Sequence, residues 1–517
     1  MKQRMLKAAS ICMLGSLVTL AGCGTESNSN NASQVTSGGK AASTKQVQAP
    51  FPGWVKGLPK ITAPEGFNWK QFAGTHLTLI SENTPPSSAL ADNIKQFEKV
   101  TGITVTIEQS DLNTVAQKVA LDFAAKSDKY QLIYADPYQI LSKYSYDFVD
   151  LNTFNNDPNL PHIPGGLKDF IQSQLFVDGY MGNMQHLYAV PYDCPTMILF
   201  YRKDIFDNPT YKAMFKKEEG FDWTPGPNLT WQQYYTIEKW INQKIKQGVI
   251  KGVKYAAGDQ AKQYDSLQCD FSDLLAAYGG DYFKSSSLGS LGATNPGPSA
   301  MDSSKAIAAA TMYKNIVQAA APGSTSWDWN GLAEAFAAGD IAMAPEWHED
   351  ASMMENPAKS KVVGKVGYAI LPHGPARSAN IFGGTGIGIN KNATSEEQKA
   401  AWLFIVWATS PQSQYMILKS KDGGETPTRY SVYNLPEIKK GMTPGTPESK
   451  EMPNLLAMKA TLEAWKSQNV YMRPKIPQWP QVDSIVFTEL SKMLANEETP
   501  AQAMKNIAQQ TNQLTGQ

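Results

Sequence analysis

The sequence predicts an α/β protein of two lobes that are joined by crossover strands. From Thr75 onward, strand-like and helix-like segments alternate, which is typical of a parallel sheet with right-handed crossovers. The chain has 517 residues, and this length exceeds what one ordinary hydrophobic core supports. In residues 188–206, Pro191 and Pro195 restrain an extended segment next to an apolar run. We interpret that segment as a passage between the lobes, although a buried strand after a loop is the simpler alternative.

Composition and motifs argue against several function classes. The formal net charge is zero, so no basic face predicts a nucleic-acid partner. The five histidines are dispersed, and the sequence contains no HExxH, GxSxG or phosphate-loop motif. We therefore predict no cofactor, no metal site and no enzymatic activity. A glycosidase needs only two carboxyl groups close in space, so an anchored polysaccharide hydrolase stays open as the alternative.

The N-terminus has the features of a lipoprotein signal peptide. Lys2, Arg4 and Lys7 precede an apolar stretch at 8–20, which is too short to span a bilayer. The sequence Leu-Ala-Gly-Cys follows and resembles a bacterial lipobox, which predicts a signal peptide at 1–22 and lipidation of Cys23. A plain secretion signal with an accidental cysteine is the alternative. Residues 23–48 are rich in Ser, Asn, Thr and Gly and predict a flexible tether.

Two regions after the tether bear on packing. Residues 49–74 alternate aromatic residues with Pro and Gly and predict an irregular arm on the first lobe. Besides Cys12 and Cys23, the chain contains Cys194 and Cys269. We expect these two to be buried free thiols, with one disulfide as the alternative.

The first lobe begins with three predicted strands, at 76–80, 103–107 and 130–135, separated by helices. Ligands of open α/β sheets bind beyond the carboxyl ends of the strands. Two loops qualify, because parallel strands bring them to the same edge. They contain Glu82 and Asn83 after the first strand and Asp136 and Tyr138 after the third. Asn83 and Asp136 are equally suited to cap the next helices.

The second half of the chain continues the alternation. Residues 207–229 are rich in Pro and Gly and predict an insertion, after which Thr230 caps a helix. A strand at 253–256, a helix at 301–318 and strands ending near Trp347 and Pro372 follow. The glycines at 383–388 enter a strand and do not open a helix, so they lack the geometry of a dinucleotide loop.

Several motifs occur in the order found in one known family. They are AVPYD at 189–193 with YRKDIF at 201–206, the helix start Thr230-Trp231, GDIAMAPEW at 339–347, VGYAILP at 366–372 and PTRYSV at 427–432. Together they resemble the extracellular solute-binding proteins of sugar ABC transporters, family 1, which are similar to maltose-binding protein. The resemblance runs from about Thr75 to the C-terminus.

This resemblance implies a two-lobed fold of the periplasmic-binding-protein type II kind, with two or three crossover strands. It implies a first lobe of 75–193 plus 374–430 and a second of 194–373 plus 431–517. The implied function is that of a monomeric, lipid-anchored, extracytoplasmic protein on the bacterial cell membrane, which captures a sugar or oligosaccharide for an ABC permease.

The loops at the sheet edge and the resemblance together predict a ligand site between the lobes. Trp347 is expected to stack on the solute, with a core aromatic as the alternative, and Trp479 is a second stacking candidate. Arg429 is expected either to fix the crossover or to touch the ligand. The complete predicted set is Glu82, Asn83, Asp136, Tyr138, Tyr192, Asp193, Tyr264, Asp265, Glu346, Trp347, Gly384, Thr385, Arg429 and Trp479.

Overall fold

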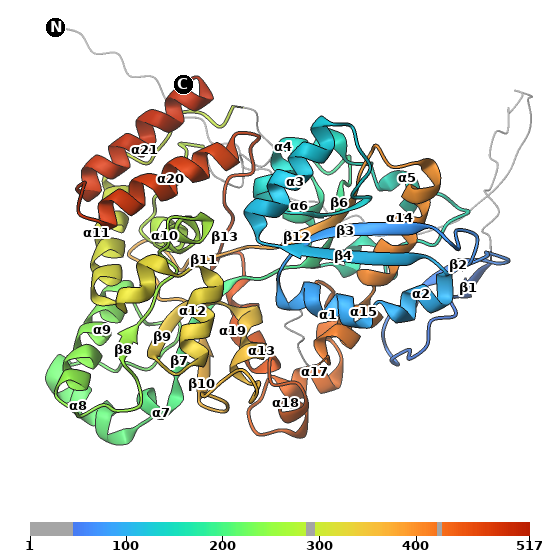
Figure 1. Ribbon diagram of the computed structural model, residues 1–517. Helices are drawn as coiled ribbons and strands as arrows, with labels where there is room; N and C mark the ends of the chain where they lie inside the picture. The colour runs from blue at the N-terminus through green and yellow to red at the C-terminus, as the bar shows by residue number, and fades with distance from the viewer. Residues whose placement is uncertain (1–44, 286–294, 421–425) are drawn as a thin grey trace, which may run out of the picture. The chain divides into compact units, whose positions relative to one another are not determined.

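Two β-sheets organise the fold, one in each lobe (Figure 1). The structure is a computed structural model that describes residues 45–285, 295–420 and 426–517. The predicted signal peptide, Cys23 and nearly all of the predicted tether lie outside the described residues. In the described ranges, no helix combines the length and apolar character that a membrane crossing requires.

The first sheet has five strands in the order β4-β3-β5-β12-β6. β3 pairs in parallel with β4 and β5, which confirms the parallel sheet expected from the sequence, and β12 runs antiparallel to β5 and β6. Helices α3 and α14 pack on β3. The bounds are β3 (His76–Glu82), β4 (Thr104–Ser110), β5 (Leu132–Ala135), β6 (Ala189–Asp193), β12 (Thr385–Ile389), α3 (Leu112–Ala124) and α14 (Ser395–Ala408).

The second sheet has four strands in the order β10-β7-β9-β8. β7 is antiparallel to β9 and β10, and β8 is parallel to β9. Helix α9 packs on β8, α12 on β9 and α19 on β10. The bounds are β7 (Met197–Arg202), β8 (Tyr255–Ala257), β9 (Ile341–Trp347), β10 (Val366–Ala369), α9 (Trp231–Lys246), α12 (Trp329–Ala337) and α19 (Leu455–Ala464).

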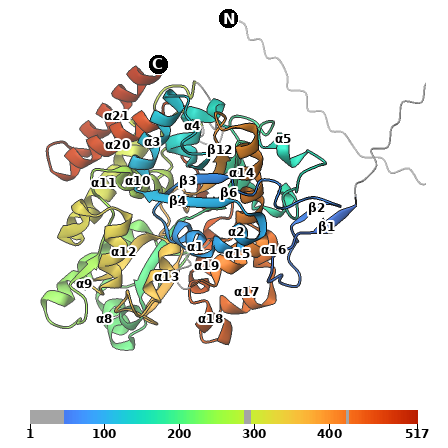
Figure 2. The ribbon, with the colours of Figure 1, turned by 45° about the vertical axis from the view of Figure 1, so that its right-hand side comes forward.

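The C-terminal helices complete the second lobe. Helix α20 (Trp479–Leu494) packs on α10 (Asp265–Ala277), and α21 (Pro500–Thr515) packs on α11 (Ser304–Ala319), as Figures 1 and 2 both show. The shorter helices are α1 (Pro85–Asn93), α2 (Lys95–Thr101), α4 (Ser142–Tyr144), α5 (Asn152–Asn155), α6 (Gln172–Gly179), α7 (Lys203–Phe206), α8 (Pro209–Glu219), α13 (Ala351–Met354), α15 (Pro411–Leu418), α16 (Tyr430–Tyr433), α17 (Pro436–Gly441) and α18 (Pro447–Glu451).

Two of the connections between the sheets run side by side. The first joins β6 to β7 through Pro195 and Thr196, and the second enters β12 through Phe382 and Gly383. Thr196 forms an antiparallel bridge with Phe382, and the Gly383 N–H donates to the Pro195 carbonyl at 3.0 Å. Next to them, β11 (Asn380–Ile381) pairs in parallel with β13 (Val470–Tyr471). The Thr196–Phe382 bridge holds the two connections together between the two sheets. A hinge motion of the lobes would bend the chain at this place.

The segment predicted to be an insertion, 207–229, contains helix α8, which occupies eleven of its residues. Asn208 caps this helix, with Pro209 at its first position, and both are helix-start signals. Arg429 forms an isolated bridge with Phe170 and then opens the short helix α16.

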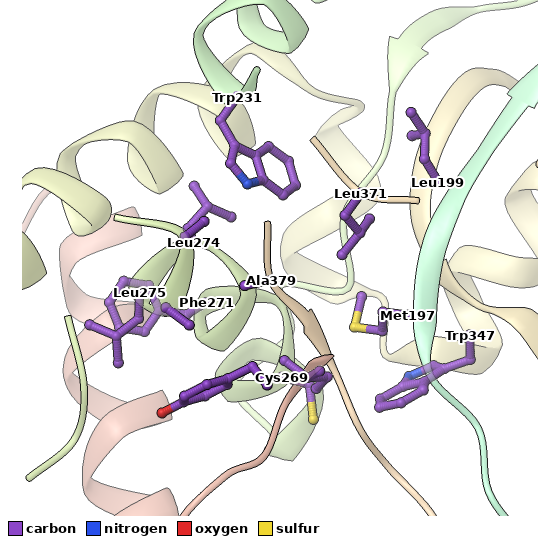
Figure 3. Packing of buried hydrophobic residues seen from close by; sticks show 14 of the residues in the cluster. Met197, Leu199, Trp231, Cys269, Phe271, Leu274, Leu275, Trp347, Leu371 and Ala379 are labelled. Atoms are coloured by element: carbon purple, nitrogen blue, oxygen red, sulfur yellow. The ribbon is translucent and has the colours of Figure 1, made fainter. Parts of the chain in front are cut away.

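The expectation that Cys194 and Cys269 are buried and do not form a disulfide is confirmed, and the Cys194 thiol donates to an Asp178 carboxylate oxygen at 3.1 Å. At the start of the described residues, β1 (Gln46–Gln48), in the predicted tether, pairs with β2 (Thr62–Pro64) in the predicted arm, and Phe51 and Phe72 join the hydrophobic core of the first lobe. Figure 3 shows Cys269 and Trp347 in the largest hydrophobic cluster, most of which belongs to the second lobe.

Candidate functional site

A cavity opens where the carboxyl ends of β3 and β5 face the end of β9. Its walls come from the loops after β3 and β5, the end of β9, the start of α10 and the Gly383–Gly384 connection. The cavity has a volume of about 60 Å³, and one water needs roughly 10–15 Å³. In this conformation, the cavity therefore has room for one small solute.

The cavity brings together six of the residues that the sequence predicts. Both loops of the first sheet contribute, as expected for the ligand edge of an open α/β sheet, and strand β9 delivers Trp347 from the second lobe. The six residues are Glu82, Asn83, Asp136, Asp265, Trp347 and Gly384.

Several predicted residues lie next to the cavity without lining it. The buried Asp193 carboxylate accepts a hydrogen bond from Thr84 Oγ1 at 3.0 Å. Thr385 pairs with Asp193 in the first sheet. The ring of Tyr264 packs against Trp329 with 5.0 Å between centroids. Glu346 turns back towards its own backbone, where its Oε1 accepts from the Trp347 N–H at 2.8 Å.

The remaining predicted residues have structural surroundings. Tyr192 and Trp479 are buried, and Trp479 packs on Tyr138 with 6.3 Å between centroids. Arg429 lies away from the cavity, where its Nε faces an Asp169 carboxylate oxygen at 3.2 Å and its guanidinium covers the Phe170 ring. Of the two roles expected for Arg429, these contacts support fixing the chain next to the crossover.

The cavity also contains functional candidates that the sequence did not reveal. Glu349 and Asp350 line it, because the short turn at 348–350 directly follows the strand that delivers Trp347. His348, in contrast, points away and contacts Thr426. The other cavity residues absent from the predicted set are Thr84, Pro85, Leu112, Tyr134, Pro195, Cys269, Trp329, Asn330, Gly383 and Arg473.

Arg473 is held firmly in the wall of the cavity. One of its Nη atoms lies 3.6 Å from an Asp265 carboxylate oxygen and donates to Gln268 Oε1 at 3.1 Å. Its guanidinium lies 4.2 Å from the centroid of the Tyr138 ring, in a cation–π contact. The side chain is 4% exposed, and its Nε has no hydrogen-bond partner.

Burial makes the carboxyl groups of the cavity weak acids. Burial raises the pKa of Asp136 to about 6, although the backbone N–H of Gln139 acts in the opposite direction. Burial, and then the charge of Asp193, raises the pKa of Asp350 to about 7. Burial, followed by the charges of Asp136 and Asp193, raises the pKa of Glu82 well above its usual value. Like charges in a poorly solvated space disfavour ionisation.

Asp193 and Glu349 form a pair of carboxyl groups at the cavity wall. Burial raises the pKa of Asp193 to about 6, and Asp193 shares a hydrogen bond with Glu349. Burial, and then the charges of Asp193 and Asp350, raises the pKa of Glu349 well above its usual value. Two carboxyl groups can share such a bond only when one of them is protonated. In the described part of the chain, no group of three metal-ligating side chains converges on one point.

The comparisons with known proteins agree with this architecture. A family model described as bacterial extracellular solute-binding protein matches residues 93–444. A probable amino-acid ABC transporter periplasmic-binding protein from Sinorhizobium fredii is 24% identical over 442 residues, covering 85% of this chain and 89% of the relative.

Solved structures show the same fold. A solute-binding protein from Agrobacterium radiobacter in complex with ribitol has a TM-score of 0.67 at 24% identity, covering 86% of this chain and 99% of the other. The maltose-bound MalE3 of T. maritima has a TM-score of 0.68 at 23% identity, covering 85% and 100%. The family model spans most of the chain, and the two-lobed fold is that of its solved neighbours. The chain therefore belongs to the family of bacterial extracellular solute-binding proteins.

Proposed function

We propose that this protein captures a sugar or polyol between its lobes and delivers it to an ABC importer in the membrane. The observation that carries this proposal is the cavity, in which Trp347 and Trp329 lie opposite loops rich in hydrogen-bonding groups. Indole rings pack on the apolar faces of sugars, while carboxyl groups and backbone amides bind hydroxyl groups. The ribitol and maltose bound by the two structural neighbours support this ligand class.

The proposed mechanism is closure of the lobes around the solute. Each sheet supplies one wall, and the paired connections at Thr196 and Phe382 supply the hinge. A solute that contacts both walls stabilises the closed state more than the open one, and the permease distinguishes the two states. The lobe boundaries that belong to this proposal are those expected from the sequence, with the chain passing between lobes near 193 and 374. The protein acts as a monomer, without a cofactor.

The solute class is tested by thermal melting of residues 24–517 with ribitol, D-mannitol, D-glucose and maltose. A solute that binds only the folded protein raises the melting temperature with the logarithm of its concentration. We expect a rise of several degrees with at least one compound, recovered chemically intact. The small cavity favours a monosaccharide or polyol over maltose. Cleavage of the compound would establish a hydrolase instead, and no shift with any compound would contradict the proposed ligand class.

The membrane anchor is tested separately. We expect Cys23→Ser to move the protein from the membrane fraction to the soluble extracytoplasmic fraction, because the lipid attached to Cys23 is the proposed anchor. Immunoblots of fractionated cells measure this, with Cys12→Ser as the matched control because Cys12 lies inside the predicted signal peptide. Unchanged membrane retention of Cys23→Ser would contradict lipidation at this residue.

A further inference from the structure

The cavity has a strong imbalance of charge-bearing groups. Five carboxyl side chains line it, and Arg473 is the one basic side chain among the cavity-lining residues that the structure describes. That arginine faces an Asp265 carboxylate oxygen at 3.6 Å, and its charge also acts on Asp136. The remaining four are Glu82, Asp136, Glu349 and Asp350, and none of them forms an ion pair in the described ranges of the chain.

A neutral solute does not remove this imbalance. Neutral carboxyl groups also hydrogen-bond hydroxyl groups, so the binding of hydroxyls does not by itself account for so many acids around one small space. Buried carboxyl groups are normally paired with a cation or neutralised by a proton. Asp193, directly behind Glu349, adds a further acid and shares a hydrogen bond with it. Closing the lobes around a neutral solute would leave this cluster without a cation.

The chemistry of the walls favours an organic cation over a metal ion. No three metal-ligating groups converge within the described residues. Two indole rings, Trp347 and Trp329, line the same space, and aromatic faces attract ammonium groups. The Nε of Arg473 is buried and has no hydrogen-bond partner, and a buried donor of this kind is stabilised by an acceptor such as a hydroxyl oxygen. The walls thus suit a molecule that combines hydroxyl groups with an ammonium group.

Resting on the proposed function, we propose that the solute is an amino sugar or amino polyol, whose protonated amine lies among Glu349, Asp350 and Glu82. The ammonium group supplies the positive charge that the cavity lacks, and its three N–H donors match the carboxyl oxygens. The hydroxyl groups bind Arg473 and the loop after β3, and the carbon face lies against the tryptophans. N-acetylation would remove the charge and weaken binding.

The test is isothermal titration calorimetry with matched compounds on the soluble chain 24–517. The probes are D-glucosamine, D-glucose and N-acetyl-D-glucosamine, together with 1-amino-1-deoxy-D-glucitol and D-glucitol. We expect at least one amine to bind about ten-fold or more tightly than its neutral parent, and N-acetyl-D-glucosamine to bind more weakly than D-glucosamine. Neutral parents that bind as tightly as the amines would overturn this inference while leaving the proposed function intact. Absence of binding by every compound would overturn both.

Two variants test whether the cavity carboxyl groups cause the preference for amines over their neutral parents. Glu349→Gln keeps the shape of the side chain and a hydrogen bond to Asp193 but cannot become negative. We expect it to reduce the ratio of amine to parent affinity several-fold, and Asp350→Asn provides a second variant if the first folds poorly. Glu219→Gln makes the same chemical change on the exposed end of α8 and should leave the ratio unchanged. An unchanged ratio in both cavity variants would contradict the inference.

Discussion

Replacing Trp347 with alanine is expected to lower the affinity for the transported solute by about 100-fold. The indole lines the cavity and is 7% exposed, so its loss removes a large apolar contact. Full burial of such a side chain against a ligand contributes roughly 1.5–3 kcal/mol, and about 2.7 kcal/mol corresponds to 100-fold. Calorimetric titration of the tightest-binding compound from the solute panel measures the change.

The same substitution is also expected to lower the stability of the ligand-free protein. Trp347 belongs to the hydrophobic core and packs on Gly383, where an added Cβ would lie 2.7 Å from the indole. Truncation of a buried tryptophan costs about 3–5 kcal/mol. Trp223→Ala is the matched control, because Trp223 is 1% exposed and does not line the cavity. It should lower stability but not affinity, and an equal loss of affinity in both variants would contradict a direct role of Trp347.

The ligand-free protein is expected to become less stable as the pH rises from 5 to 7. Burial raises the pKa of Asp136 and Asp193 to about 6, and that of Asp259 and Asp350 to about 7. In the unfolded chain, these groups ionise near pH 4. Their stabilising effect is thus complete below pH 4 and is lost as the pH rises through 6 and 7. A single group lowers the free energy of unfolding by at most about 1.4 kcal/mol per pH unit, and its effect ends as the pH passes its folded pKa.

The buried His348 acts in the opposite direction. Burial lowers the pKa of His348 to about 3, so this residue adds stability as the pH rises towards its unfolded pKa near 6.5. One histidine does not offset four carboxyl groups, and the net change stays negative. Urea unfolding at pH 5 and pH 7 measures it, and Asp350→Asn should show a smaller difference because one titrating group is gone. Stability that increases from pH 5 to pH 7 would contradict the expectation.

The sequence predicted those parts of the fold that depend on local patterns. The strands at 76–80 and 103–107 and the cap Thr230 depend only on neighbouring residues, and the structure contains the corresponding strands and a capping box at Thr230. The helix at 209–219 was missed because the prolines and glycines around it dominated the interpretation of 207–229.

Some cavity residues were predictable from a rule of topology or from the family resemblance, and the others were not. Glu82 and Asp136 followed from the position of parallel strand ends, and Trp347 followed from the resemblance to a family. Glu349 sits one turn beyond Trp347, but which side of that turn faces the cavity depends on tertiary packing. Arg473 had no local signal, because its partner Gln268 lies 205 residues earlier in the chain.

The position of Arg473 has a consequence for how the protein is made. The ribosome delivers the cavity acids first, between residues 82 and 350, and their single basic neighbour only near the end of the chain. A polypeptide halted before residue 473 would gather those acids without the guanidinium that offsets Asp265. The family model ends before this point, at residue 444, so the segment that supplies Arg473 to the cavity wall lies outside the matched region.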